Sequence, residues 1–325
     1  MKVPGKVLNH ARRDWPPFPP AASIHYFSAR TPVYNRMVRF ASITLAGAAF
    51  CAIFPLLRGA APAPADDPAV KGRELVLQSL AALGGDRFLE MQDRIEDGRA
   101  YSFFNEKLAG LSLARIYTRY LTPPDPPVAA FIGQRERQVF GKDETAYVLL
   151  DENHGFNVTY RGARPVPDAD YARYRESLLH NVFYILRMRL KEPGMGFESR
   201  GIDLYNNVPV DVVDIYDNDN RSVTVYFEQS THYPVRQLWF QRNQVTHDRD
   251  EEVTVFSKFR DTKGVKWPWV TLRERNGERI YEIFCESVAI NSGVTDEKFT
   301  LPANMKILPG IEATPGRQAT PGKKN

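Results

Sequence analysis

The stretch that decides the fold class of this chain is Phe259-Arg260-Asp261-Thr262-Lys263-Gly264-Val265-Lys266-Trp267-Pro268. It connects two runs, residues 253–259 and 267–273, whose aromatic and β-branched residues predict β-strands. Similar runs follow one another at even spacing up to Phe299-Thr300-Leu301-Pro302. No acidic pair, histidine cluster or glycine-rich phosphate loop interrupts them. The pattern therefore indicates a β-sheet scaffold that holds something.

Further strand-type runs extend outward from this stretch. We predict strands at 95–104, 111–120, 135–140, 145–150, 156–160, 210–216, 222–228, 234–241, 253–259, 267–273 and 279–290. Short connections such as Asn276-Gly277 favour antiparallel neighbours in a meander. Several runs are apolar on both faces, since Trp267 and Trp269 lie opposite to Val270 and Leu272. Something apolar must therefore cover the second face, either helices or a ligand.

Helical periodicity predicts a first helix at 70–83, ended by Gly84-Gly85, and a short one at 86–92. A long helix is predicted at 169–191, with Asp168 as N-cap and Pro193-Gly194 as the stop. Its broad apolar arc suits a helix laid across a sheet or over a hydrophobic cavity. Together these elements predict the α+β class.

The net charge of +4 originates in the N-terminal part of the chain. Residues 1–65 hold eight of the 43 Lys and Arg residues and one of the 39 acidic residues, which leaves 35 basic and 38 acidic residues afterwards. Nucleic acid is therefore not an expected partner. Residues 37–65 combine a basic start, the apolar run 40–57 and small residues, which is typical of a secretory signal cleaved after Ala65. The alternative is an uncleaved membrane anchor.

Both interpretations place residues 66 onward outside the cytoplasm, as a periplasmic or secreted domain at 66–305. Residues 1–36 are proline-rich and precede a more suitable start at Met37, so we expect them to be untranslated or disordered. The repeated Thr-Pro-Gly units of residues 306–325 predict a disordered tail. Cys285 alone follows the signal, which excludes an intramolecular disulfide.

No catalytic or metal constellation is visible in the sequence. The segment 217–220 resembles the start of a calcium loop, but Arg221 and Ser222 occupy the places of a further ligand and the turn glycine, so it predicts a turn. The acidic residues Asp248, Asp250, Glu251 and Glu252 fall in a predicted hairpin connection. We therefore predict no enzymatic activity, no cofactor and no metal, with a secreted hydrolase as the less favoured alternative.

The order of motifs in the second half of the chain resembles the LolA/LolB-like superfamily of periplasmic carriers that sort outer-membrane lipoproteins. The hairpin 259–268 carries one motif, and residues 226–236 resemble a strand, a short turn and the entry to the next strand. Val288-Ala289-Ile290-Asn291 through Phe299-Thr300-Leu301-Pro302 resembles the closing segment. The likeness covers residues 208–302. The chain is longer than the compact carriers and lacks the lipid-anchored cysteine of the outer-membrane acceptor.

The resemblance implies a curved antiparallel sheet, an incomplete barrel of about eleven strands, with helices that cover its concave face. It also implies a non-enzymatic binding protein whose cavity takes the acyl chains of a lipid or lipoprotein. An envelope protein-interaction or stress-sensing module on the same fold is the alternative, with a protein partner. Membrane contact would be transient or made through an uncleaved N-terminal anchor. The residues predicted to line the cavity are Phe183, Leu186, Phe227, Trp239, Phe256, Trp267 and Trp269.

Overall fold

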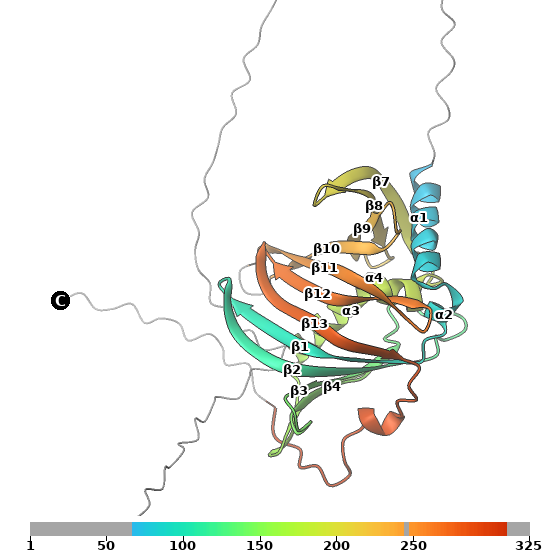
Figure 1. Cartoon of the computed structure of the whole chain (residues 1–325). Coiled ribbons are helices and arrows are strands. Elements are labelled where there is room, and N and C mark those ends of the chain that lie inside the picture. The colour runs from blue at the N-terminus through green and yellow to red at the C-terminus, as the bar shows by residue number, and fades with distance from the viewer. Residues whose placement is uncertain (1–66, 244–246, 311–325) are drawn as a thin grey trace, which may run out of the picture.

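The computed structural model of the protein describes residues 67–243 and 247–310. They form one antiparallel sheet of 13 strands that is curved and open (Figure 1). The predicted α+β fold with an incomplete barrel is therefore confirmed, with more strands than the eleven expected. The predicted segments 1–36 and 37–65 and the part of the tail beyond residue 310 lie outside the described residues.

The first six strands of the sheet precede the long helical segment and the other seven follow it. They are β1 (Asp93–Phe104), β2 (Lys107–Tyr120), β3 (Gln134–Phe140), β4 (Tyr147–Leu150), β5 (Gly155–Thr159), β6 (Gly162–Pro165), β7 (Gly196–Tyr205), β8 (Val208–Tyr216), β9 (Ser222–Glu228), β10 (Pro234–Arg242), β11 (Arg249–Thr262), β12 (Val265–Arg275) and β13 (Glu278–Ile290). The sequence pattern did not predict β6 and β7. The first is four residues long, and the second is mostly exposed and lacks apolar alternation.

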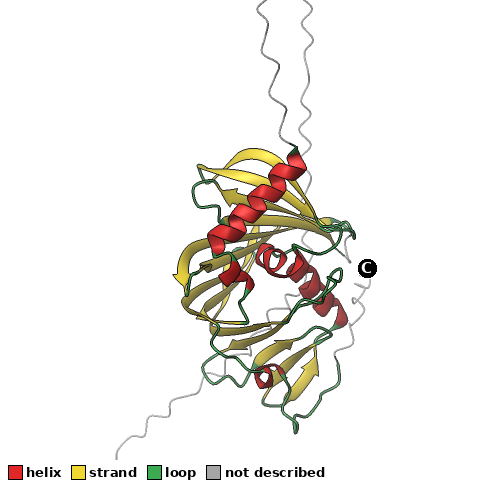
Figure 2. Cartoon of the chain, turned by 90° about the vertical axis from the view of Figure 1, so that its right-hand side faces the viewer, coloured by secondary structure: helices red, strands yellow, loops and turns green. Residues whose placement is uncertain are grey.

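The spatial order of the strands is β6-β5-β4-β3-β2-β1-β13-β12-β11-β10-β9-β8-β7. The chain thus starts in the middle of the sheet, meanders to the edge at β6, and resumes at the opposite edge at β7. It then meanders back until β13 pairs with β1, where Arg94 lies opposite Ile290. The segment between β6 and β7 must therefore travel from one edge to the other, and it does so as helices across the concave face (Figure 2).

The helical elements are α1 (Pro68–Leu83), α2 (Asp86–Leu89), α3 (Asp168–Leu179), α4 (Val182–Tyr184), the π-helical turn η1 (Ile185–Arg189) and the 3-10 turn η2 (Asp296–Phe299). The predicted continuous helix at 169–191 is wrong, because Asn181 starts a new helix. Its side-chain oxygen accepts hydrogen bonds from the backbone N–H groups of Phe183 and Tyr184 at 3.0 and 3.2 Å. Asp168 is the first residue of α3, and Pro167 occupies the N-cap. Within the described ranges, no helix is both long and apolar enough to cross a membrane.

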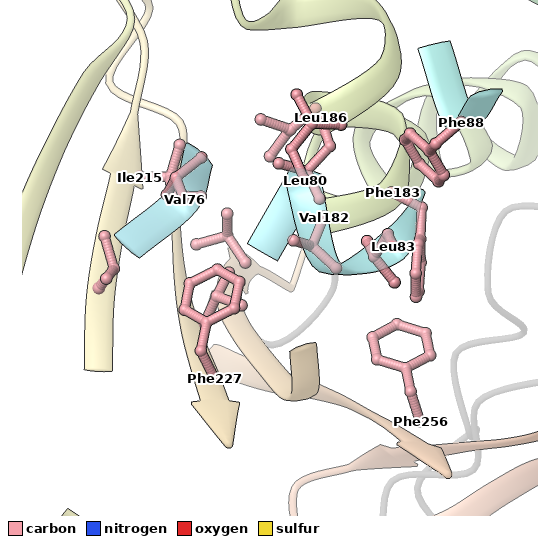
Figure 3. Packing of buried hydrophobic residues seen from close by; sticks show 14 of the residues in the cluster. Val76, Leu80, Leu83, Phe88, Val182, Phe183, Leu186, Ile215, Phe227 and Phe256 are labelled. Carbon is pink, nitrogen blue, oxygen red and sulfur yellow. The ribbon is translucent and has the colours of Figure 1, made fainter. Parts of the chain in front are cut away.

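The main hydrophobic core lies between the concave face and the helices. Figure 3 shows Val76, Leu80 and Leu83 of α1 near Val182 and Leu186, with aromatic side chains of the sheet below them. Helix α1 reaches the sheet closely at Gly72, where an added Cβ would lie 2.8 Å from the backbone nitrogen of Glu198. The helices therefore cover the second face of much of the sheet, as its two-sided apolar pattern requires.

A second core lies on the outer face of β2 to β6. Phe299 of η2 and Val294 are buried there against Tyr117 and Val139. The closing Phe299-Thr300-Leu301-Pro302 motif thus covers part of the outer face (Figure 1). Past the predicted domain boundary at 305, Leu308 donates a backbone hydrogen bond to the carbonyl of Ala163 at 2.8 Å, so the chain follows β6 to this point.

Candidate functional site

A cavity of about 300 Å³ lies where the crossing helices pass over the sheet. Strands β1, β2, β3, β11, β12 and β13 form its floor, and α3 and α4 form its roof. A smaller space of about 130 Å³ lies beside it under α3. The two spaces share Gln138, Tyr174, Ser177, Arg273 and Ile280, so they follow one another beneath the helix. The main cavity has the volume of a small-ligand pocket, at the lower end of that range.

Aromatic side chains form one wall of the main cavity. The ring of Phe183, from α4, meets the ring of Phe256 edge-on at 4.9 Å between centroids. The ring of Trp267 lies at the same distance from Phe183 on another side. All three rings belong to the main core, and they also line the cavity. This wall offers apolar area for a hydrocarbon group.

The floor beside this wall is polar, with a buried ion pair on β1. Arg94 Nε donates to a Glu96 carboxylate oxygen at 3.0 Å, and the guanidinium lies over the ring of Trp267 at 4.1 Å. Arg94 also donates to the hydroxyl groups of Thr118 and Tyr120. The nearby Glu96 raises the pKa of Arg94 against the opposing effect of burial. Arg94 and Glu96 thus neutralise each other. The pair also positions Trp267, because Trp267 Nε1 donates to Glu96 at 2.8 Å.

Strand β3 adds a second carboxylate to the floor. Glu136 accepts hydrogen bonds from the side-chain amides of its neighbours Gln134 and Gln138, the first at 3.2 Å. Burial raises the pKa of Glu136, although the amide of Gln138 and the charge of Arg94 act in the opposite direction. No ion pair to Glu136 occurs in the described part of the chain. The cavity therefore contains a carboxyl group that takes up a proton more readily than usual.

Helix α3 is held over the cavity by polar contacts near its ends. Tyr171 donates its hydroxyl to the carbonyl of Asp151 at 2.7 Å, and Arg273 donates to the Ser177 hydroxyl at 3.3 Å. Only Leu178 and Leu179 of this helix are buried. The roof of the cavity is thus more loosely packed than the core beside it.

The segment after α3 is anchored firmly by Arg189. Its guanidinium pairs with Glu192 at 2.6 Å and with Asp217 at 2.6 Å, and donates to the carbonyl of Leu179 at 2.7 Å. Asp217 also accepts from the backbone N–H of Asp219 and Arg221, which closes the turn at 217–220. This segment was predicted to be a turn, and its first carboxylate is used by Arg189. No group of three or more His, Cys, Asp or Glu side chains suitable for a metal occurs in the described ranges.

The structure distributes the seven predicted cavity residues over three environments. Phe183, Phe256 and Trp267 line the main cavity. Leu186 and Phe227 are fully buried in the main core. Trp239 stacks on His180 with centroids 4.1 Å apart, beside an outer groove, and the half-buried Trp269 packs against the core.

Sequence reasoning did not select the polar residues of the floor, Arg94, Glu96, Glu136 and Arg273. The available signal was the run Gln134-Arg135-Glu136-Arg137-Gln138, which is polar in a strand that lies well inside the sheet order. A strand buried on both faces is normally apolar. A polar run there indicates a hydrated or ligand-binding face.

No protein-family model matches the chain, and no curated protein matches it in sequence. Its structure is similar to that of a DUF1329 family protein from Desulfovibrio piger, with a TM-score of 0.51 and 12% identity over 72% of this chain and 98% of the other. The chain therefore shares the fold of that protein. At this level of identity the similarity concerns the fold alone.

Two further solved structures are less similar to this chain. A putative outer membrane lipoprotein-sorting protein domain from Vibrio parahaemolyticus has a TM-score of 0.48 at 11% identity, over 71% of this chain and 97% of the other. A LolA superfamily protein from Nitrosomonas europaea has a TM-score of 0.44 at 9% identity, over 71% and 97% of the two chains.

Proposed function

We propose that this chain is a non-enzymatic binding protein that shelters the acyl part of a lipid or lipoprotein in the cavity under α3. The observation that supports this most directly is the wall of Phe183, Phe256 and Trp267 on a partly open space between sheet and helices. Of the seven cavity residues predicted from the sequence, this proposal keeps these three as the cavity wall.

The volume of the cavity limits the size of the ligand that it can bind in this conformation. About 300 Å³ suits one slender ligand, in line with the lower end of small-molecule pockets. Each buried methylene contributes about 0.8 kcal/mol, so a single chain supplies most of the affinity. Binding needs no chemical step, and the polar groups of the floor orient the ligand.

The proposal includes a location in the periplasm or outside the cell. Its support is the signal-like segment at 37–65, with cleavage after Ala65. A carrier in that compartment would meet the membrane transiently, or would stay near it through the uncleaved segment. N-terminal sequencing of the chain from an envelope fraction tests this part, and a start at Asp66 is the expected result.

The binding function is tested by recovering ligands from the purified full chain. Native mass spectrometry combined with lipid extraction should detect one acyl ligand per chain. Thr271→Phe should abolish that signal, because Thr271 lines the cavity and the added ring fills it. Leu272→Phe is the matched control, since it adds bulk to the opposite face of the same strand.

Three outcomes contradict the binding function. These are an absence of acyl ligand in the wild type, no uptake of a fluorescent fatty acid, and equal uptake by Thr271→Phe and wild type. A protein that copurifies with a chain lacking acyl ligand would instead favour the interaction-module alternative.

A further inference from the structure

Only some of the charged side chains that line the main cavity form ion pairs with one another. Four charged side chains reach it: Arg94, Glu96, Glu136 and Arg273. The first two form an ion pair with each other at 3.0 Å. Glu136 and Arg273 have no ion-pair partner within residues 67–243 and 247–310, and they are more than 4.0 Å apart. Among the described residues, the cavity thus presents one guanidinium that forms no direct ion pair with a carboxylate, and one carboxyl group that forms none with a cation.

Arg273 is placed to meet a ligand. It lies on β12, lines both spaces under α3, and makes one hydrogen bond, to the Ser177 hydroxyl at 3.3 Å. A guanidinium has five N–H donors, so most of them stay available. Tyr174 and Tyr281 belong to the same lining, and the Tyr174 hydroxyl is buried without a hydrogen-bond partner of normal geometry in the described chain. Donors therefore exceed acceptors in this part of the cavity.

We propose that Arg273 and the tyrosine hydroxyls beside it form a headgroup site for an acidic amphiphile, with its carboxylate or phosphate on Arg273 and its alkyl chain along Phe183, Phe256 and Trp267. This inference rests on the proposed binding function and specifies its ligand. A guanidinium fits a carboxylate or phosphate with two parallel hydrogen bonds, which makes Arg the suited residue for such a head.

Burial weakens the opposition of Glu136 to an acidic headgroup, because it disfavours the charged carboxylate. Burial raises the pKa of Glu136, and its carboxylate already accepts from two glutamine amides. A nearby anion would raise this pKa further, and the protonated carboxyl group would then add one more donor. A cationic head would have to bind Glu136, because Glu96 is already engaged by Arg94 and Trp267, and burial disfavours the charged form of Glu136.

The experiment compares four ligands of equal chain length on the full chain by isothermal titration calorimetry. Dodecanoate and dodecyl phosphate carry the acidic head, while dodecanol is neutral and dodecyltrimethylammonium is cationic. At neutral pH we expect at least one acidic ligand to bind about tenfold or more tightly than dodecanol. The ratio between the first two shows which oxyanion the site prefers.

Arg273→Gln should remove this preference and leave the affinity for dodecanol unchanged. Arg99→Gln is the matched control, because Arg99 is exposed on β1 and pairs with the exposed Glu286. Should Arg273→Gln not fold, Arg273→Lys keeps the charge but loses the bidentate fit, and should lower the preference several-fold.

The results that overturn the inference are distinct from those that overturn the proposed function. Equal binding of dodecanol and both acidic ligands, or an unchanged preference in Arg273→Gln, overturns the headgroup site alone. Failure of all four ligands to bind overturns the binding function together with the site.

Discussion

The guanidinium of Arg94 lies flat against Trp267, with Cζ 4.1 Å from the ring centroid, and both side chains bind the same carboxylate, Glu96. The three groups come from two strands that are not neighbours, since β13 lies between β1 and β12. The arrangement therefore connects β1 to β12 across the strand between them. It also fixes one aromatic wall of the cavity, because Trp267 Nε1 has its partner in Glu96.

Removing Glu96 should destabilise the fold strongly. In Glu96→Ala the buried Arg94 loses its ion pair and Trp267 loses its acceptor, and we expect a loss of about 3 kcal/mol in the free energy of unfolding. Urea denaturation followed by circular dichroism measures this. Glu286→Ala is the control, because its pair with Arg99 is about 58% exposed and should contribute less than about 0.5 kcal/mol. Equal losses in the two variants would contradict the structural role given to Glu96.

Glu136 should make the protein less stable as the pH rises through the weakly acidic range. Burial raises its pKa above the ordinary 4.5, so the folded state holds the proton more tightly than the unfolded state. Its contribution is then greatest below the ordinary pKa and is lost as the pH rises from there through the folded-state pKa. The charged groups that face Glu136 are Arg94 and Glu96 of β1 and Arg273 of β12.

Glu136→Gln tests this pH dependence. The difference in unfolding free energy between variant and wild type should favour the variant more at about pH 7 than at about pH 4. Glu90→Gln, at an exposed position, should show no such trend. A wild type that gains as much stability as Glu136→Gln over this range would show that Glu136 ionises as an ordinary exposed carboxyl group.

Elements that depend on neighbouring residues in the sequence were predicted correctly. Features that depend on tertiary contacts were missed. The hairpin 259–268 and the end of α1 at Gly84 follow from turn chemistry, and the structure has both. The break at Asn181 had a local sign, an N-cap residue inside an apolar segment, but the apolar arc on both sides concealed it.

The polar floor of the cavity could not be predicted in the same way. Strand β3 is polar at every position from Gln134 to Gln138, so its period does not tell which side faces the cavity. Arg273 likewise lies in the polar run Arg273-Glu274-Arg275 at the end of β12. Only the pairing of β3 with β2, β2 with β1, β1 with β13 and β13 with β12 brings these side chains together.

Gly72→Ala should displace α1 from the sheet. The added methyl group would lie 2.8 Å from the backbone nitrogens of both Glu198 and Ser199, which cannot move without disturbing β7. We expect a loss of about 2 kcal/mol in unfolding free energy, together with faster proteolysis within residues 67–83. Ala81→Ser, at an exposed position of the same helix, should change stability by less than about 0.5 kcal/mol. A Gly72→Ala protein as stable as Ala81→Ser would show that α1 does not pack as closely as described.

The two halves of the crossing segment should differ in local stability. Helix α3 buries only Leu178 and Leu179 of its 12 residues. The segment α4 to η1 buries most of its side chains and is anchored through Arg189 to Glu192 and Asp217. Amide hydrogen exchange should therefore be faster at 168–179 than at 182–189, because local opening follows buried contacts.

Arg189→Met tests whether the ion pairs of Arg189, in addition to burial, protect residues 182–189 from exchange. It leaves Glu192 without its guanidinium and Asp217 with that of Arg221 alone, and exchange at 182–189 should rise toward the rate of α3. Arg175→Met, exposed on α3, should leave both rates unchanged. If 168–179 and 182–189 exchange equally in the wild type, the roof of the cavity is no looser than the core beside it. Entry of a ligand beneath α3 would then require opening of the whole crossing segment, since both halves would open together.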